Sequence, residues 1–234
     1  MIMEYKECGL TMKQFLDKIH KKYEGERFTF AARLDPMACG IVPLVPREDF
    51  KNFNSYLKSN KRYNVKVMIG IQTDSDDVLG KIEKIDSKYF DKVEINRLKV
   101  YLEGERTGEI EQKYHYFSSK RIQKRRKGDM KEYSHKVSLY KSKVVSVGYI
   151  KIRDWLVDVM RDIDKVDKSC DFRQLEILEQ WKKIEILYGD KMISYMNMEM
   201  DVSSGFFVRQ YVRDKIDESK VPMLAYYIKR TKIY

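Results

Sequence analysis

Apolar side chains recur along the chain at two different spacings, which together predict a mixture of helices and strands. A helix is expected from Thr11, because Thr11 and Gln14 form a capping box ahead of apolar positions at helical spacing. Alternation of apolar and polar residues predicts strands at 63–71, at 137–152 and at 155–160.

Weaker patterns complete the expected order of elements. They are helices near 50–57, near 92–102, at 172–181 and after Gly205, and short strands near 82–85 and 196–200. Residues 28–46 carry prolines and a glycine, so a loop with short extended pieces is expected there. Because helices and strands mix without a regular βαβ order, the chain is predicted to be one α+β domain over residues 1–234.

The charge balance favours a polyanionic partner. The chain has 47 Lys and Arg against 36 Asp and Glu, which gives a net charge of +11 and a pI near 9.3. Clustered cations gain affinity for nucleic acid by displacing counterions from phosphates. A lysine-rich genome would give the same net charge, so the clustering of the cations has to decide between the two explanations.

One basic segment is strongly clustered and follows Tyr114, Tyr116 and Phe117. Its seven cations are Lys120, Arg121, Lys124, Arg125, Arg126, Lys127 and Lys131. Cations next to aromatic rings favour contact with RNA, because phosphates are neutralised and unstacked bases find a ring to stack on. The alternative is a solvated charged loop or a localisation signal.

Few residues suit a metal, a disulfide or a membrane. The three cysteines and three histidines are scattered, which argues against a zinc site and a disulfide framework. The acidic stretch at 73–80 lacks calcium-loop spacing and is expected to be a turn in which Thr73 and Ser75 satisfy backbone groups. Without a signal segment or a long apolar run, the chain is expected to be intracellular, cytoplasmic or nuclear, and not secreted.

Three positions could carry chemistry. Asp35 lies between Leu34 and Pro36. The proline would hold the Asp35 carboxylate out from a rigid loop, where it could act as a nucleophile or a base. The alternative is an ordinary Asp-Pro turn. Tyr63 heads a strand and could stack on a flipped base, or could be a core tyrosine. Arg209 could pair with a carboxylate, or could be a solvated surface arginine.

Taken in order, these segments resemble the TruB family of pseudouridine synthases. FTFAARLDPMACGIVP resembles the family block G-H-x-G-T-L-D-P-x-A-x-G-V-L-P, and KRYNVKVMIGIQTDSDDVLG resembles K-x-Y-x-x-x-x-x-x-G-x-x-T-D-T-x-D-x-x-G. SSGFFVRQYVRD is similar to S-x-G-T-Y-I-R with an Asp one turn later, and IKRT is similar to L-R-R-T. The opening K-x-x-G-x-T also matches, at Lys6, Gly9 and Thr11.

The resemblance implies a central mixed, largely antiparallel sheet flanked by helices, and it implies roles for matching residues. Asp35 would be the essential carboxylate that drives cleavage of the uridine glycosidic bond and its re-formation at carbon 5. Tyr63 would stack on the flipped uracil and help to remove the proton at carbon 5, and Arg209 would position Asp35. The substrate-binding positions would be Lys61, Ile228, Leu34 and Phe30.

The resemblance also implies how RNA is held. Residues 112–136, called here the thumb segment, resemble the mobile thumb that clamps the RNA, and the expected contacts are Lys120, Arg121, Lys124, Arg125, Arg126 and Lys127. The implied substrate is the T-loop uridine of tRNA, modified by a monomer without cofactor or metal. No PUA domain is expected, because the chain stops where the family's catalytic domain normally ends.

Two alternatives remain open. The family's histidine before the catalytic aspartate is Phe30 here, and the glycine and threonine that follow are replaced within Ala31, Ala32 and Arg33. These departures and the strong basic segment suit a non-catalytic tRNA-binding or tRNA-folding module of the same fold. The other alternative is a guide-dependent ribosomal RNA pseudouridine synthase, although the acidic-loop block favours the stand-alone branch.

Overall fold

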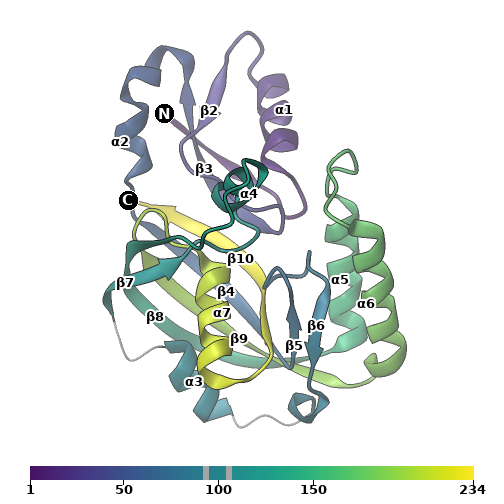
Figure 1. Ribbon diagram of the computed structural model, residues 1–234. Coiled ribbons are helices and arrows are strands. Elements are labelled where there is room, and N and C mark those ends of the chain that lie inside the picture. Colours follow the sequence, from purple (N-terminus) through teal and green to yellow (C-terminus); the bar gives the residue numbers. More distant parts are fainter. Residues whose placement is uncertain (92–94, 104–106) are drawn as a thin grey trace.

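The computed structural model describes residues 1–91, 95–103 and 107–234 (Figure 1). The strands are β1 (Ile2–Lys6), β2 (Phe28–Phe30), β3 (Ala38–Pro46), β4 (Lys61–Ile69), β5 (Ile71–Thr73), β6 (Ile82–Ile85), β7 (Gly108–Lys113), β8 (Ser134–Lys151), β9 (Met192–Val202) and β10 (Met223–Ile233). The helices are α1 (Met12–Lys22), α2 (Phe53–Leu57), α3 (Ile95–Glu103), α4 (Ser119–Arg126), α5 (Ile152–Asp164), α6 (Gln174–Tyr188) and α7 (Val208–Ser219), with short 3-10 segments at Arg47–Asn52 and Ser87–Tyr89.

The strands form one large sheet and one separate hairpin. The large sheet has eight strands in the order β1-β3-β10-β4-β9-β8-β7, with β2 paired to β3, and β5 pairs with β6. Neighbours in the large sheet are antiparallel except β3 and β10, which run parallel. The expected α+β fold with a mixed, largely antiparallel sheet is therefore confirmed.

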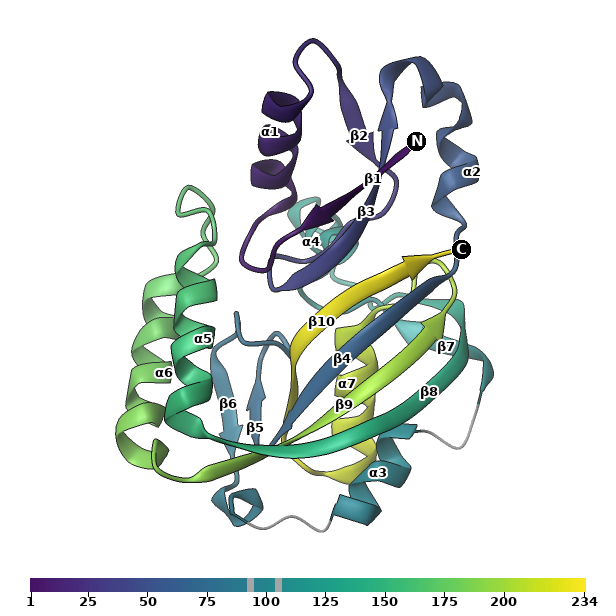
Figure 2. The same ribbon diagram turned by 180° about the vertical axis from the view of Figure 1, so that it is seen from behind.

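Helices cover the sheet on one face and flank it at one side. Helices α3 and α7 lie against the face seen in Figure 1, and α5 and α6 pack together beside the β5–β6 hairpin (Figures 1 and 2). Val65 and Val67 of β4 share a core with Tyr211 of α7. A second core is built around Trp155 and Trp181, whose ring centroids lie 5.5 Å apart. Both cores exclude water from side chains that the sequence pattern marked as apolar.

Several local predictions are confirmed. Thr11 and Gln14 form both halves of the capping box at the start of α1. The predicted strand near 63–71 is divided at Gly70, whose φ of +101° lets the chain turn between β4 and β5. The helix expected near 92–102 is α3, although residues 92–94 lie outside the described residues.

Two local predictions are wrong. Residues 155–160 belong to helix α5, in which Trp155, Leu156 and Val159 are buried at helical spacing, so the short alternation there was coincidental. Residues 38–46 form strand β3 and are not a loop. The fixed φ of proline suits an extended chain, and the Pro43 carbonyl still accepts a hydrogen bond from Ala31 N at 2.9 Å.

The parallel pairing of β3 with β10 brings two distant parts of the chain together. Gly40 of β3 has a φ of +115°, and a Cβ atom at this position would lie 2.2 Å from the Arg230 carbonyl oxygen of β10. A side chain at Gly40 would therefore push the strands apart. The close approach places Arg230 next to the loop at 31–37, which carries Asp35.

Candidate active site

Two buried cations hold the backbone of the loop that carries Asp35. Lys6 is fully buried, and its Nζ donates to the carbonyl oxygens of Asp35 at 3.2 Å, Pro36 at 3.2 Å and Ala38 at 2.7 Å. Burial lowers the pKa of Lys6 to about 8. Lys6 fixes the loop on the C-terminal side of Asp35, and no carboxylate among the described residues pairs with it.

Arg230 holds the N-terminal side of the same loop. Its guanidinium donates to the carbonyl oxygens of Ala32 and Arg33 at 3.1 Å each and to that of Ile41 at 2.6 Å. The side chain is almost completely buried. Because a guanidinium is planar with donors in a fixed fork, three carbonyl contacts set the direction in which the loop leaves β2.

Asp35 is ion-paired with Arg209, as the sequence resemblance implied. Arg209 lies on the first turn of α7, and its Nε and Nη2 atoms lie 2.9 Å and 2.8 Å from Asp35 Oδ2. The Arg209 side chain is 8% exposed and the Asp35 side chain 42% exposed. The arginine therefore anchors the carboxylate from inside the protein, while the carboxylate itself stays accessible.

Arg209 also contacts the acidic loop at 73–77. Its Nη1 donates to the Ser75 carbonyl at 3.1 Å and lies 3.4 Å from Asp77 Oδ2. Asp77 is buried, and its other oxygen accepts from Ser75 Oγ at 2.7 Å and from Leu79 N at 2.9 Å. Burial raises the pKa of Asp77, and the Arg209 charge opposes this shift. In turn, Asp35 and Asp77 raise the pKa of Arg209 against the effect of its burial.

A cavity of about 400 Å³ opens in front of Asp35. Its walls include Leu34, Tyr63 and Ile228, all buried, together with Lys61 and Arg209. Burial lowers the pKa of Lys61 to about 8, and the Arg230 charge adds to the shift. The cavity is therefore mostly apolar, with an acidic group and cations at fixed places, as small-molecule and base-binding sites usually are.

Phe30 is the one expected pocket residue that does not line this cavity. It lies half-buried on β2, and the Arg33 guanidinium is stacked over its ring at 5.1 Å from the centroid. Arg33 itself lines the cavity. The Arg33 side chain, which stacks on Phe30, therefore lines the same cavity as Asp35.

His115 and Asp76 form a second buried pair close to the first network. His115 Nε2 lies 2.9 Å from Asp76 Oδ2, and Arg213 Nε donates to the same oxygen at 2.9 Å. Burial raises the pKa of Asp76 to about 7 and lowers that of His115 to about 3. His115 lines the cavity that contains Asp35 and also a neighbouring cavity of about 350 Å³.

The thumb segment consists of the end of β7, helix α4 and the start of β8. Two of its predicted contacts, Arg126 and Lys127, are exposed. Lys124 and Arg125 lie over the rings of Tyr133 and Tyr116, at 3.0 Å and 3.7 Å from the centroids. The Lys120 side chain lies outside the described part of the chain.

Arg121 differs from the other predicted cations of the thumb segment. It is buried, and its guanidinium donates to the carbonyl oxygens of Lys131 and Met130, the second at 2.7 Å. A guanidinium used in this way ties α4 to the strand that follows and has few donors left for a phosphate.

Several residues of the site were not singled out from the sequence as site residues: Lys6, Asp77, His115 and Arg230. Lys6 and Asp77 stand in the blocks that carried the family resemblance, and Arg230 stands in the matching IKRT. Nothing in their local spacing indicates that they meet, because each contact joins segments far apart in the chain. The hydroxyl contacts expected inside the acidic loop are present, since Thr73 Oγ1 donates to the Asp77 carbonyl at 2.6 Å.

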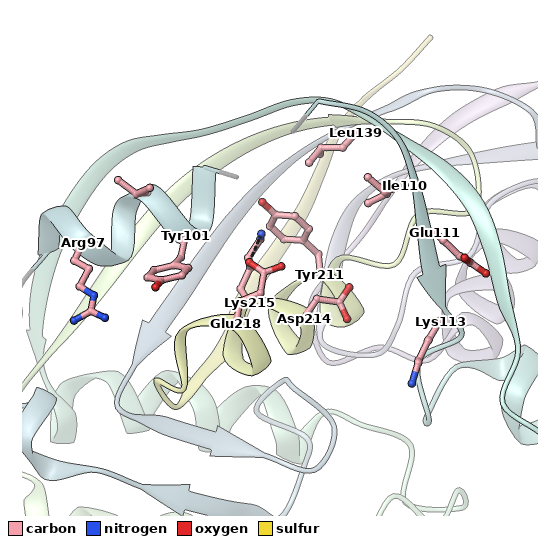
Figure 3. Close-up of a pocket in the computed structure, with 11 residues that line it drawn as sticks. Arg97, Tyr101, Ile110, Glu111, Lys113, Leu139, Tyr211, Asp214, Lys215 and Glu218 are labelled. Atoms are coloured by element: carbon pink, nitrogen blue, oxygen red, sulfur yellow. Dashed lines mark hydrogen bonds and ion pairs between the residues drawn. The ribbon is translucent and has the colours of Figure 1, made fainter. Parts of the chain in front are cut away.

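A larger cavity of about 840 Å³ lies between α3, α7 and β7 (Figure 3). Tyr101, Ile110, Tyr211 and Asp214 are among its lining residues. Gln210 donates to Asp214 at 2.8 Å, and burial raises the pKa of Asp214. None of the three candidate catalytic residues lines this cavity, so it is separate from the candidate active site.

Two other features are absent from the part of the chain that the structure describes. No described helix is both long and apolar enough to cross a membrane. Among the same residues, no three His, Cys, Asp or Glu side chains come together in a way that could hold a metal ion.

Known proteins show the same fold. The chain superposes on a crystal structure of a Cbf5-Nop10-Gar1 complex with a TM-score of 0.59 and 14% identity, over 98% of this chain and 47% of that one. It also superposes on a structure of an H/ACA RNP bound to a substrate RNA containing 2′-deoxyuridine, with a TM-score of 0.55 and 13% identity, over 97% and 45% of the two chains.

Sequence comparison gives the family. The tRNA pseudouridine synthase B of Prochlorococcus marinus (strain NATL2A) is 26% identical over 229 residues, which is 98% of this chain and 60% of that protein. The protein of the same name from Wigglesworthia glossinidia brevipalpis is 32% identical over 117 residues, 49% of this chain and 34% of that protein. The family model described as TruB family pseudouridylate synthase (N terminal domain) matches residues 20–166, more than half of the chain. The chain therefore belongs to the TruB family of pseudouridylate synthases.

Proposed function

We propose that this chain is an RNA pseudouridine synthase that isomerises a uridine of tRNA, and that the T-loop uridine is its substrate. One observation carries the proposal: an accessible carboxylate, Asp35, is held at the mouth of a cavity by a buried arginine, Arg209. A base that leaves the RNA stack can enter such a cavity and meet a carboxylate of fixed orientation. The names of the relatives support the same reaction.

In the proposed reaction, the bond between ribose C1′ and uracil N1 breaks and a bond between C1′ and C5 forms. The C5 proton leaves and N1 gains a proton, so substrate and product are isomers and no redox partner is needed. Asp35 would drive the cleavage and the re-formation, since carboxylates act in this way on glycosidic bonds. Tyr63 would stack on the uracil and help to remove the C5 proton. Leu34 and Ile228 would keep water from the detached ribose.

The thumb segment would hold the RNA over the cavity. Arg126 and Lys127 are exposed and free to approach phosphates, and we propose that they do so together with Lys124 and Arg125. The cations on Tyr116 and Tyr133 are held in place by the rings beneath them. Arg121 would shape the thumb instead of contacting RNA.

The test is pseudouridine mapping on an unmodified tRNA transcript. Purified protein is incubated with the transcript, and pseudouridine is located by carbodiimide-blocked primer extension. The expected result is a new stop at one T-loop uridine, absent with Asp35→Asn, while tRNA binding persists. Asp190→Asn is the matched control, because the Asp190 side chain is 81% exposed on the surface and pairs with Arg153.

Two outcomes would count against the proposal. A stop that persists at wild-type strength with Asp35→Asn would exclude Asp35 as the essential carboxylate. Tight tRNA binding without any stop in any RNA tested would favour the binding or folding module. A stop at another uridine would retain the reaction and change the substrate.

A further inference from the structure

The acidic loop at 73–77 connects several elements that surround the candidate site. Asp77 faces Arg209 of α7, and Asp74 pairs with Arg173 at the start of α6. Asp76, between them, is buried and has a φ of +58°, a left-handed conformation that holds its side chain in one direction. Neighbouring carboxylates of one short loop therefore reach different parts of the protein.

Asp76 is bound by the root of the thumb segment. Its Oδ2 atom lies 2.9 Å from Nε2 of His115, which is 2% exposed. Phe117 N donates to His115 Nδ1 at 3.2 Å, so Nδ1 is the acceptor nitrogen and Nε2 carries the hydrogen. Because burial lowers the pKa of His115 to about 3, the imidazole is a neutral donor at physiological pH.

The position of His115 in the chain makes this bond a link between the acidic loop and the thumb segment. His115 is the second residue after β7, and its carbonyl accepts from Ser118 N at 2.9 Å, where Ser118 caps helix α4. The backbone of His115 therefore helps to fix where helix α4 begins. The ring also forms part of the wall of the cavity that contains Asp35.

Asp76 and Asp77 are neighbours in one hydrogen-bonded loop. The Asp77 carbonyl accepts from Thr73 Oγ1 at 2.6 Å, and Ser75 Oγ binds Asp77 Oδ1 at 2.7 Å. The Asp76 carbonyl accepts from Ala225 N of β10 at 2.9 Å. The Asp76 carboxylate also accepts from Arg213 Nε at 2.9 Å, one turn after Arg209 on α7, so a displacement of this carboxylate would disturb the loop at Asp77 and the helix that carries Arg209.

We propose that His115 is a positioning residue that couples the seat of the thumb segment to the Arg209–Asp35 pair through the loop at 73–77. The proposal rests on the proposed function, because the rate it affects is that of uridine isomerisation. With RNA held by the thumb segment as proposed, the His115–Asp76 bond keeps the loop at Asp77, and thereby Arg209, aligned on Asp35. His115 contacts no reacting atom in this scheme.

The experiment compares two substitutions of His115 in the full chain. His115→Phe keeps a ring of similar size and removes the donor, whereas His115→Gln keeps an N–H near the place of Nε2. The single-turnover rate at saturating tRNA is expected to fall about tenfold in His115→Phe and to recover to within about threefold in His115→Gln, while the Kd for tRNA changes less than about twofold in both. His20→Phe, an exposed histidine on α1, is the control with an unchanged rate.

A second readout does not depend on activity. Hydrogen exchange is measured by mass spectrometry in wild type and in His115→Phe. Coupling predicts faster exchange both in peptides from the thumb root at 114–118 and in peptides from the acidic loop at 75–80, whose Leu79 N–H binds Asp77. If His115 anchors only the thumb root, His115→Phe should speed up exchange in the peptides from 114–118 alone.

The outcomes separate this inference from the proposed function. If wild type modifies tRNA and His115→Gln is as slow as His115→Phe, the donor role is excluded while the reaction stands. If His115→Phe weakens tRNA binding without slowing the bound complex, the coupling is excluded. If wild type modifies no RNA, the proposed reaction fails, and hydrogen exchange alone decides the coupling: an increase confined to 114–118 overturns it.

Discussion

Arg209 and Asp77 form a contact that is almost closed to solvent. The Nη1 and Oδ2 atoms lie 3.4 Å apart, and the two side chains are 8% and 5% exposed. The same guanidinium holds Asp35 through Nε and Nη2. The accessible carboxylate is thus tied to a buried one through a single planar group, and the alignment of Asp35 depends on a residue that no RNA would touch.

Replacement of Asp77 tests this dependence. Asp77→Asn keeps the shape and removes the charge that faces Arg209, so the guanidinium loses a buried partner worth ~1–3 kcal/mol. The rate at saturating tRNA is expected to fall by about tenfold to a hundredfold, with little change in tRNA affinity. Single-turnover kinetics measures the rate, and filter binding measures the affinity.

Asp74→Asn is the matched control for Asp77→Asn. Asp74 belongs to the same loop but pairs with Arg173, which does not contact Asp35. Its substitution should leave the rate within about threefold of wild type. Equal losses in both variants would mean that general loosening of the loop, and not the Arg209 contact, sets the rate.

Arg230→Lys tests how the loop at 31–37 is held. Lysine keeps the charge but offers no planar fork, so the carbonyls of Ala32, Arg33 and Ile41 cannot all keep a donor. The free energy of unfolding should fall by ~1–3 kcal/mol, as measured by urea titration. The rate should fall as well, since the loop positions Asp35.

Lys232→Arg, on the same strand and exposed, gives the comparison for Arg230→Lys. It should change neither the unfolding free energy nor the rate. A wild-type unfolding curve for Arg230→Lys would mean that water can replace the missing donors.

The buried His115 predicts a pH dependence of stability. Its pKa is lowered in the folded protein from 6.5 to about 3, so below about pH 6.5 the unfolded chain binds a proton that the native protein does not. The contribution of His115 to native-state stability should therefore fall as the pH drops from 6.5 towards 3, by roughly 1.4 kcal/mol per pH unit, while the raised pKa of Asp76 acts in the opposite direction. His115→Gln lacks this proton site.

The measurement is the unfolding free energy of wild type minus that of His115→Gln at several pH values. This difference should be constant above about pH 7 and should decrease below it. Asp76 is present in both proteins, so its own titration largely cancels. A difference that rises on acidification would mean that His115 gains its proton in the folded state.

The exposed cations of the thumb segment should set part of the salt dependence of tRNA binding. If Arg126 contacts a phosphate as proposed, Arg126→Ala removes that contact, and the slope of log K against log salt concentration should become shallower by about one unit. Arg126→Lys keeps the charge and should keep the slope. Equal slopes for wild type and Arg126→Ala would place Arg126 outside the RNA interface.

Local sequence patterns predicted the elements that are decided within a few residues. The capping box at Thr11 and the alternation that starts at Tyr63 are both present, because a cap and a half-buried strand depend on neighbouring side chains. The strand predicted from the alternation at 155–160 was wrong because that pattern, too, covers only a few residues. A window of six residues cannot separate a strand from a helix that also carries an apolar residue on its exposed face, as α5 does at Val157, which is 56% exposed.

The candidate site was predicted in part. The family resemblance placed Asp35 and Arg209 together, and the structure shows them in contact. The partners of the backbone loop were not predicted, because Lys6 and Arg230 bind carbonyl groups, which every residue has and no sequence motif marks. The pairing of Asp76 with His115 was missed because neither residue has a local partner in the sequence.

The pairing of β10 with β3 has a consequence for the point during synthesis at which the candidate site is completed. Asp35 leaves the ribosome early, yet the loop around it needs Arg230, which is translated nearly two hundred residues later. Until β10 is added to the sheet, the carbonyls at 32, 33 and 41 lack their donor and Gly40 has no neighbouring strand on that side. We therefore expect nascent chains that end before β10 to bury much of their apolar surface but to lack the proposed isomerase activity, which would begin only after β10 has joined the sheet.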